Sequence, residues 1–121
     1  MSTNNTYLAV FLGSKTGPRR AAWDALAEGD RRAREREGMA AWNAWVNKHH
    51  AVIVGMGGPL GQTKTVTQRG IADTSNDMAA FTIVQADSHE AAAKLFDNHP
   101  HFSIFPGDGV EVMPVLPIPG A

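Results

Sequence analysis

The sequence predicts an α+β fold: one ferredoxin-like βαββαβ unit with an antiparallel sheet and both helices on one face. Apolar runs of strand length occur at residues 7–12, 51–56, 79–86 and 110–115. Stretches with helical spacing separate the first run from the second and the third from the fourth. The first run is apolar at every position, which indicates a strand that is covered on both faces.

The composition is that of one globular domain, which we expect to span residues 1–121. The chain is 43% hydrophobic and 19% charged. Residues 1–6 are a polar tail, and the proline-containing residues 116–121 are expected to be extended. A net charge of −1 argues against nucleic acid as a partner. No cysteine, secretory signal or membrane-length apolar run is present, so we expect a cytoplasmic protein with no membrane partner.

Residues 13–38 form a polar, basic segment after the first strand. Pro18 is typical of a helix start. Six arginines crowd among acidic residues here: Arg19, Arg20, Arg31, Arg32, Arg34 and Arg36. We interpret the segment as a solvated helical face with ion pairs, such as those of Arg32 with Glu35 and Glu37. An anion-binding patch is the alternative.

A clear helical stripe follows, with spacings of three and four: Met39, Trp42, Trp45, Val46 and His49. This stripe predicts a helix that ends near His50 and packs one face inward. The strand at residues 51–56 comes next, and Gly57-Gly58-Pro59 ends it. Residues 63–69 are threonine-rich and alternate, so they predict a short strand that pairs with residues 71–73 in an optional hairpin.

The second half of the chain repeats the order of strand, helix and strand. After the third strand, the Asp87-Ser88 pair is typical of a helix N-cap, with Glu90 placed to close a capping box. The second helix stops before Pro100. Residues 102–105 are predicted as a loop or extended stretch. Pro114 near the end of the last strand favours an edge position.

Both predicted helices cover the same face of the sheet, so the other face of the first strand needs a different cover. A second copy of the sheet supplies it most economically, because identical apolar faces can pack together around a twofold axis. The sequence therefore predicts a homodimer whose two sheets pack face to face.

Five short motifs, in their order and spacing, resemble the YCII-related family over residues 7–115. They are Trp42-x-x-Trp45, Gly57-Gly58-Pro59-Leu60, Asp87-Ser88-His89-Glu90-Ala91, His99-Pro100 and Val110-Glu111-Val112-Met113-Pro114. The resemblance implies a dimeric α/β-barrel of ferredoxin-like protomers with a small cleft. It also implies that some members act on small ring compounds by dehydrohalogenation or isomerisation, with a His–Asp pair that transfers protons. Enzyme-like members have Asp where His99 stands.

We expect a small-molecule cleft with two walls. Trp42 or Trp45 forms one side. A step of three residues leaves the two indoles about 60° apart on the helix, so one of them can reach the cleft while the other lies in the core. Gly58, Pro59 and Leu60 form the rim, and the opposite wall is residues 99–102, which include His101 and Phe102. Two core tryptophans are the alternative interpretation of the indole pair.

Histidine titrates near neutrality, so His99 and His101 are the candidates for proton transfer. If residues 99–101 are extended, both imidazoles point the same way. We take His99 as a general base with Asp73 or Asp108 as its partner. The alternatives are a histidine that caps a helix C-terminus and an aspartate that only forms a turn.

The predicted function is that of a small-molecule cleft protein, and we expect no metal and no cofactor. His99 and His101 supply two ligands at most, and no Lys-Ser or Lys-Thr follows the glycines at phosphate-loop spacing. The first hypothesis is a proton-transfer isomerase or lyase that acts on a small cyclic or aromatic compound. The alternative is a non-catalytic small-ligand binding protein or a structural dimer module. An enzyme needs a titratable pair in the cleft, whereas a binder needs only the aromatic wall and polar anchors.

Overall fold

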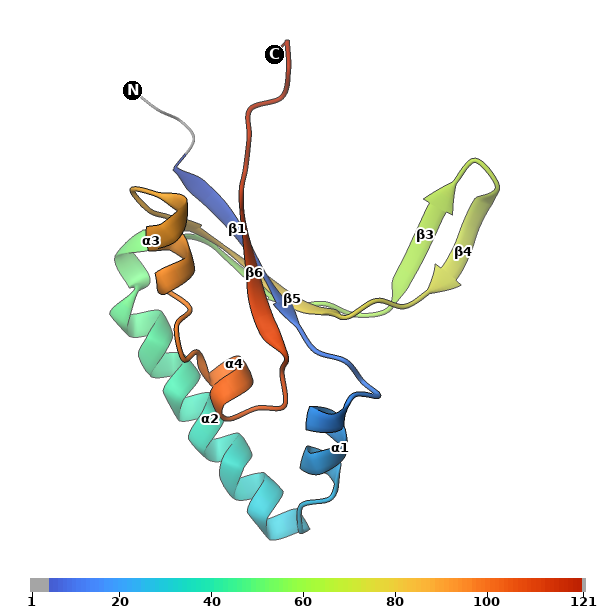
Figure 1. Cartoon of the computed structure of the whole chain (residues 1–121), viewed down its shortest axis with the longest axis vertical. Helices are drawn as coiled ribbons and strands as arrows, with labels where there is room; N and C mark the ends of the chain where they lie inside the picture. The colour runs from blue at the N-terminus through green and yellow to red at the C-terminus, as the bar shows by residue number, and fades with distance from the viewer. Residues whose placement is uncertain (1–4, 121) are drawn as a thin grey trace.

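The computed structural model describes residues 5–120, and a four-stranded antiparallel sheet is at its centre (Figure 1). Its strands, in the spatial order β2-β5-β1-β6, are Ile53–Pro59, Met78–Gln85, Thr6–Leu12 and Gly109–Pro114. The first and third strands of the unit are central, and the second and fourth are at the edges. This order is that of a ferredoxin-like βαββαβ unit, so the predicted fold class is confirmed.

The helices lie on one side of the sheet (Figure 1). They are α1 (Pro18–Asp24), α2 (Glu28–Lys48), α3 (His89–Lys94) and α4 (Pro100–Ser103), and the 3-10 turn η1 (His50–Val52) follows α2. None of the helices in residues 5–120 is long and apolar enough to span a bilayer.

Burial alternates along β1, because one face of the strand meets the helices. Tyr7, Ala9 and Phe11 are buried in the core with Ala92 and Phe96, which come from α3 and the residues just after it. The alternate residues of β1 are only half-buried. Within one chain, therefore, one face of the first strand is covered, and the other remains an open apolar face.

The register defines this open face. Leu8 is opposite Ile83, and Val10 is opposite Phe81 on β5. On the other side, Leu8 is opposite Met113 and Val10 is opposite Glu111 of β6. Side chains at paired positions of an antiparallel ladder point to the same face. Leu8, Val10, Phe81, Ile83, Met113 and Glu111 thus lie on the open face.

The arginine-rich segment is mostly helical, and α2 reaches back to Glu28. Arg32 pairs with Glu28, one turn towards the N-terminus, and not with Glu35 or Glu37. Glu28 is four residues from Arg32, and residues four apart are neighbours on a helix. The solvated face was correctly predicted, but the partner of Arg32 was not.

The second strand begins at Ile53 and runs on to Pro59, later at both ends than predicted. The residues before it, His50–Val52, continue the end of α2 as a 3-10 turn. A proline is tolerated in β2 because this strand is at the sheet edge, where its missing N–H has no partner to lose. The optional hairpin is present as β3 (Thr63–Thr67) and β4 (Gly70–Thr74).

Residues 102–105 were predicted as a loop or extended stretch, but Phe102 and Ser103 belong to the helical turn α4 (Pro100–Ser103), and only residues 104 and 105 are a loop. His99 is the N-cap of this turn, and Pro100 occupies the first helical position, where a proline has no N–H bond to lose. Ser88 caps α3 through its hydroxyl, which accepts the N–H of Ala91. Glu90 is then the second helical residue, one position short of a capping box.

Candidate functional site

An apolar cavity of about 490 Å³ lies between α2 and the strands β2 and β5. We call it the indole cavity, because the side chains of Trp42 and Trp45 line it. Gly58 and Pro59 of β2 also line it, so four of the predicted cleft residues do meet. Its other lining residues are Phe11, Met39, Val46, Met56, Gly57, Ala80, Phe81, Thr82 and Phe105.

The two indoles differ in how they are held. The Nε1–H of Trp45 donates to the main-chain carbonyl of Leu95 over 2.7 Å, which fixes this ring against the segment after α3. Trp42 stacks on Phe11 of the central strand, with ring centroids 5.2 Å apart. One indole is thus held by a hydrogen bond and the other by ring stacking, and both present apolar surface to the cavity.

The backbone of β2 approaches its neighbour closely at the cavity. Gly57 has a φ of +67°, and a Cβ at this position would overlap the carbonyl group of Phe81. Only glycine adopts this conformation without strain and also leaves room for the neighbouring strand. The register between β2 and β5 shifts at this point. The glycine-rich corner therefore shapes the cavity through its backbone.

His99 lies directly behind the two indoles and is completely buried. Its imidazole is perpendicular to Trp42, with centroids 4.6 Å apart, and is tilted by 71° from Trp45 at 4.8 Å. The imidazole does not line the indole cavity itself. The imidazole instead contacts three of the rings that line the cavity, those of Phe11, Trp42 and Trp45.

The protonation of His99 follows from its hydrogen bonds. Its Nδ1 accepts the N–H of His101 over 3.0 Å, so the neutral ring carries its proton on Nε2. Burial, with smaller contributions from His101 and His49, lowers the pKa of His99 to about 4. The ring is therefore neutral at pH 7. Its Nε2–H has no hydrogen-bond partner within residues 5–120.

His101 has a structural role. Its Nε2–H donates to the carbonyl of Leu12 over 2.7 Å, and Gly107 lies so close to the ring that a Cβ there would overlap it. Burial lowers the pKa of His101, although the Leu12 carbonyl and the charge of Asp108 act in the opposite direction. Asp108 accepts the N–H of Ser14 over 2.7 Å. The charge of Asp108 therefore raises the pKa of His101, while the charges that act on the pKa of His99 are those of His101 and His49.

Of the remaining predicted site residues, Asp73 and Leu60 lie away from His99, whereas the main-chain N–H of Phe102 donates to the carbonyl of His99 over 3.1 Å. Asp73 is in β4, where its carboxylate pairs with Lys64 over 2.6 Å on the protruding hairpin. Leu60 and Asp73 line a separate cavity of about 480 Å³ at the base of this hairpin. Phe102 lines a third cavity, beside β6. The structure therefore does not bring Asp73 to His99.

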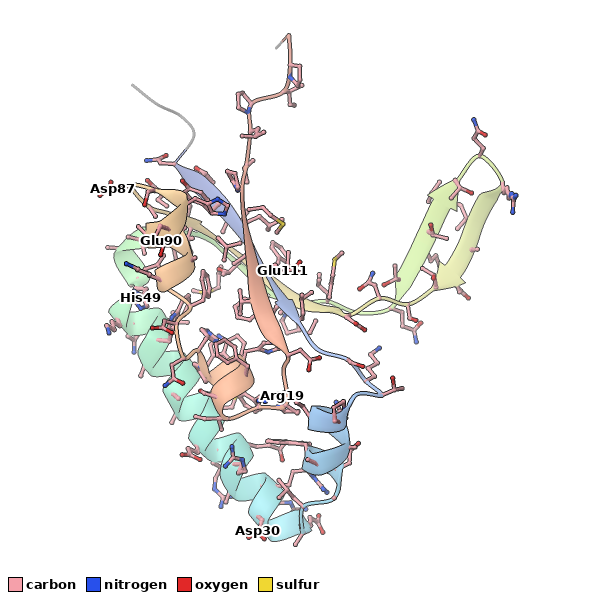
Figure 2. All side chains as sticks on the ribbon, viewed as in Figure 1. Arg19, Asp30, His49, Asp87, Glu90 and Glu111 are labelled. Atoms are coloured by element: carbon pink, nitrogen blue, oxygen red, sulfur yellow. The ribbon has the colours of Figure 1, made fainter. Side chains whose placement is uncertain are left out.

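Sequence reasoning missed Phe105, whose side chain is among those that line the indole cavity. Its ring packs on Gly38 in the middle of α2, where a Cβ would overlap it. A glycine inside a long helix was the available signal, because glycine costs helix stability unless something packs against it. Phe105 also lies between the indole cavity and a cavity lined by Arg19 and Arg34, and Figure 2 labels Arg19.

Within residues 5–120, no three histidine or acidic side chains converge as a metal site requires. No protein-family model matches the chain, and no curated protein matches it. Among solved structures, it is similar to 5-chloro-2-hydroxyhydroquinone dehydrochlorinase from Burkholderia phenoliruptrix, in complex with 2,5-dihydroxybenzoquinone. The identity is 18%, 89% of this chain and 90% of that chain are covered, and the TM-score is 0.49.

Proposed function

We propose that this chain binds a small, flat, cyclic compound in the indole cavity. The observation that carries the proposal is the cavity itself: about 490 Å³, walled by Trp42 and Trp45 and otherwise almost entirely apolar. Ligand sites in proteins have this size and this kind of lining. The hydroxyl of Thr82 is used by the fold, since it donates to the carbonyl of Gly55. The ligand is therefore a largely apolar ring.

One lining residue of the cavity can be changed with little risk to the fold, because its side chain is exposed. Met56 lines it and is 57% exposed, and Met78 is 52% exposed on the same sheet but lines a different cavity. A thermal-shift screen of small phenols, lactones and hydroxy-acids identifies ligands, because binding to the folded state raises its melting temperature. We expect the shift to survive in Met78→Glu and to disappear in Met56→Glu. An equal shift in both variants contradicts binding at the indole cavity.

A second candidate function, proton transfer at the same site, rests on the unpartnered Nε2–H of His99. A neutral imidazole with its proton on Nε2 can donate a hydrogen bond to a ligand oxygen, and this arrangement supports a donor more than a general base. The reaction type would be that of an isomerase or lyase on a small cyclic compound. A base is also needed, and the lining of the indole cavity includes no carboxylate. Ligand binding is therefore the better-supported function.

Hydrogen–deuterium exchange on a bound ligand separates the two candidates. NMR in D₂O reports exchange at carbon positions beside a ligand carbonyl. If the chain transfers protons, exchange is faster with the wild type than in buffer, and His99→Asn abolishes the acceleration. Asn keeps a side-chain acceptor at the helix N-cap, so the local fold is retained. Binding without accelerated exchange removes the second candidate and leaves the first intact.

In solution the chain forms a homodimer in which two open faces pack together. The support is the apolar character of this face, which the helices of the same chain leave uncovered. Facing sheets pack about 10 Å apart with interdigitated side chains, which removes such a surface from water. Sedimentation equilibrium tests this, and we expect twice the chain mass of 13.0 kDa. A mass of 13.0 kDa at the highest soluble concentration contradicts it.

A further inference from the structure

The hairpin of β3 and β4 stands apart from the rest of the molecule. Its strands pair only with each other, and the two-stranded ribbon leaves the four-stranded sheet on the side opposite the helices (Figure 1). We call residues 63–74 the arm. An isolated two-stranded hairpin is at best marginally stable in water. The arm therefore gains stability if a further surface packs on it.

The register divides the arm into two different faces. One face carries Val66 opposite Ile71 and, two positions away, Lys64 opposite Asp73. Val66 is 73% exposed and Ile71 is 71% exposed, although aliphatic pairs of this kind stabilise a hairpin chiefly when they are covered. The opposite face is made of small and hydroxyl side chains: Thr63, Thr65, Thr67, Ala72 and Thr74. Only the first face offers a patch for docking.

The charges of the arm and of the sheet are complementary. Lys64 and Asp73 neutralise each other over 2.6 Å, which leaves Arg69 in the turn as the net charge of the arm. The four strands of the sheet contain a single charged residue, Glu111 of β6. Glu111 is on the open face, and Figure 2 labels it on β6. Beside it on the same face is Met113, also exposed.

We propose that the arm packs on a second copy of this chain. Its Val66–Ile71 face covers the exposed margin of the partner's last strand, around Met113, and Arg69 pairs with Glu111 there. Twisted sheets that pack face to face cover their centres and leave edge strands such as β6 at the margin. Each chain has one arm and one exposed strand margin. A twofold axis therefore places the arm of each chain on the margin of the other chain. This inference rests on the homodimer proposed above and adds the arm to its interface.

Charge exchange tests the pairing of Arg69 with Glu111. Reversing one rim charge places like charges together, so Arg69→Glu or Glu111→Arg alone raises the dimer dissociation constant about tenfold or more. The double variant Arg69→Glu with Glu111→Arg restores it. Both residues are exposed, so each variant keeps the wild-type circular dichroism. Single variants that dimerise as tightly as the wild type overturn the pairing.

The apolar face of the arm is tested with a matched pair of variants. Val66→Thr with Ile71→Thr keeps β-branched side chains but makes the patch polar, and it weakens the dimer. The control, Thr65→Ser with Ala72→Ser, changes the opposite face of the same strands and leaves dimerisation unchanged. If the two variants have equal dissociation constants for the dimer, the Val66–Ile71 face is not the one that docks.

Cross-linking gives an independent result, because the chain contains no cysteine. A mixture of Arg69→Cys and Glu111→Cys chains should form a disulfide-linked dimer under mild oxidation, faster than either variant alone. If the wild type has the mass of a single chain, both the homodimer and the docking of the arm on a partner are overturned. A wild-type dimer whose arm variants are unaffected, and which gives no mixed cross-link, overturns the arm alone.

Discussion

The imidazole of His99 is perpendicular to the indole of Trp42, with ring centroids 4.6 Å apart and the histidine fully buried. The edge of one ring meets the face of the other, an arrangement that aromatic pairs favour. Because the imidazole also caps α4 through Nδ1, one side chain links the wall of the indole cavity to the turn behind it. The shape of the cavity therefore depends on a residue that does not line it.

Replacing His99 with alanine should destabilise the fold by about 2–4 kcal/mol, as do other deletions of large buried side chains. The variant also loses the acceptor for the N–H of His101. His99→Asn should cost less, because its amide oxygen can restore the cap. Urea unfolding measures both variants, with His50→Ala at an exposed position as the control. A loss no larger than that of the control contradicts the structural role of His99.

Stability should fall as the pH is lowered from 7 to 4. The pKa of His99 is about 4 in the folded chain and near 6.5 when unfolded, so between these values the unfolded state binds more protons. The loss from His99 amounts to about 3 kcal/mol and levels off below pH 4. Urea midpoints across this range measure it, and His99→Asn should flatten the curve. An NMR titration that places the folded pKa of His99 near 6.5 excludes this explanation.

Two glycines of α2 should respond to alanine in opposite ways. Gly29→Ala meets open space and should stabilise the helix by up to about 1 kcal/mol. Gly38→Ala places a Cβ where the ring of Phe105 lies, and should destabilise by about 1–3 kcal/mol. Thermal unfolding of the two variants gives the comparison directly. Stabilisation by both would show that Phe105 does not pack on Gly38.

Trp45→Phe should cost about 1–2 kcal/mol beyond the loss of ring area, because the carbonyl of Leu95 loses its donor. Trp23→Phe is the matched control, since its indole packs on Phe105 outside the indole cavity. Urea unfolding gives the two free energies. Equal losses in the two variants would indicate that the hydrogen bond of Trp45 adds no stability.

Much of the fold was predictable from local patterns. Apolar runs identify strands because extended chains bury alternate or consecutive side chains, and Ser88 marks a helix start because its hydroxyl satisfies a free N–H. The positions of Trp42 and Trp45 on one helix, with the glycine-rich corner after it, were also enough to predict one wall and most of the rim of the cavity.

The partners of His99 could not be predicted in this way. Spacing along the chain does not show that Asp73 lies on an arm that leaves the sheet, or that residues 100–103 form a helical turn. These outcomes depend on which distant surfaces meet, such as Phe105 with Gly38 and His101 with Gly107. The sequence by itself determined the four strands of the sheet, the hairpin and the long helix, in their order, because local periodicity records which side chains are buried. Only tertiary packing decided which side chains share a site, because contacts between distant segments produce no periodic pattern in the sequence.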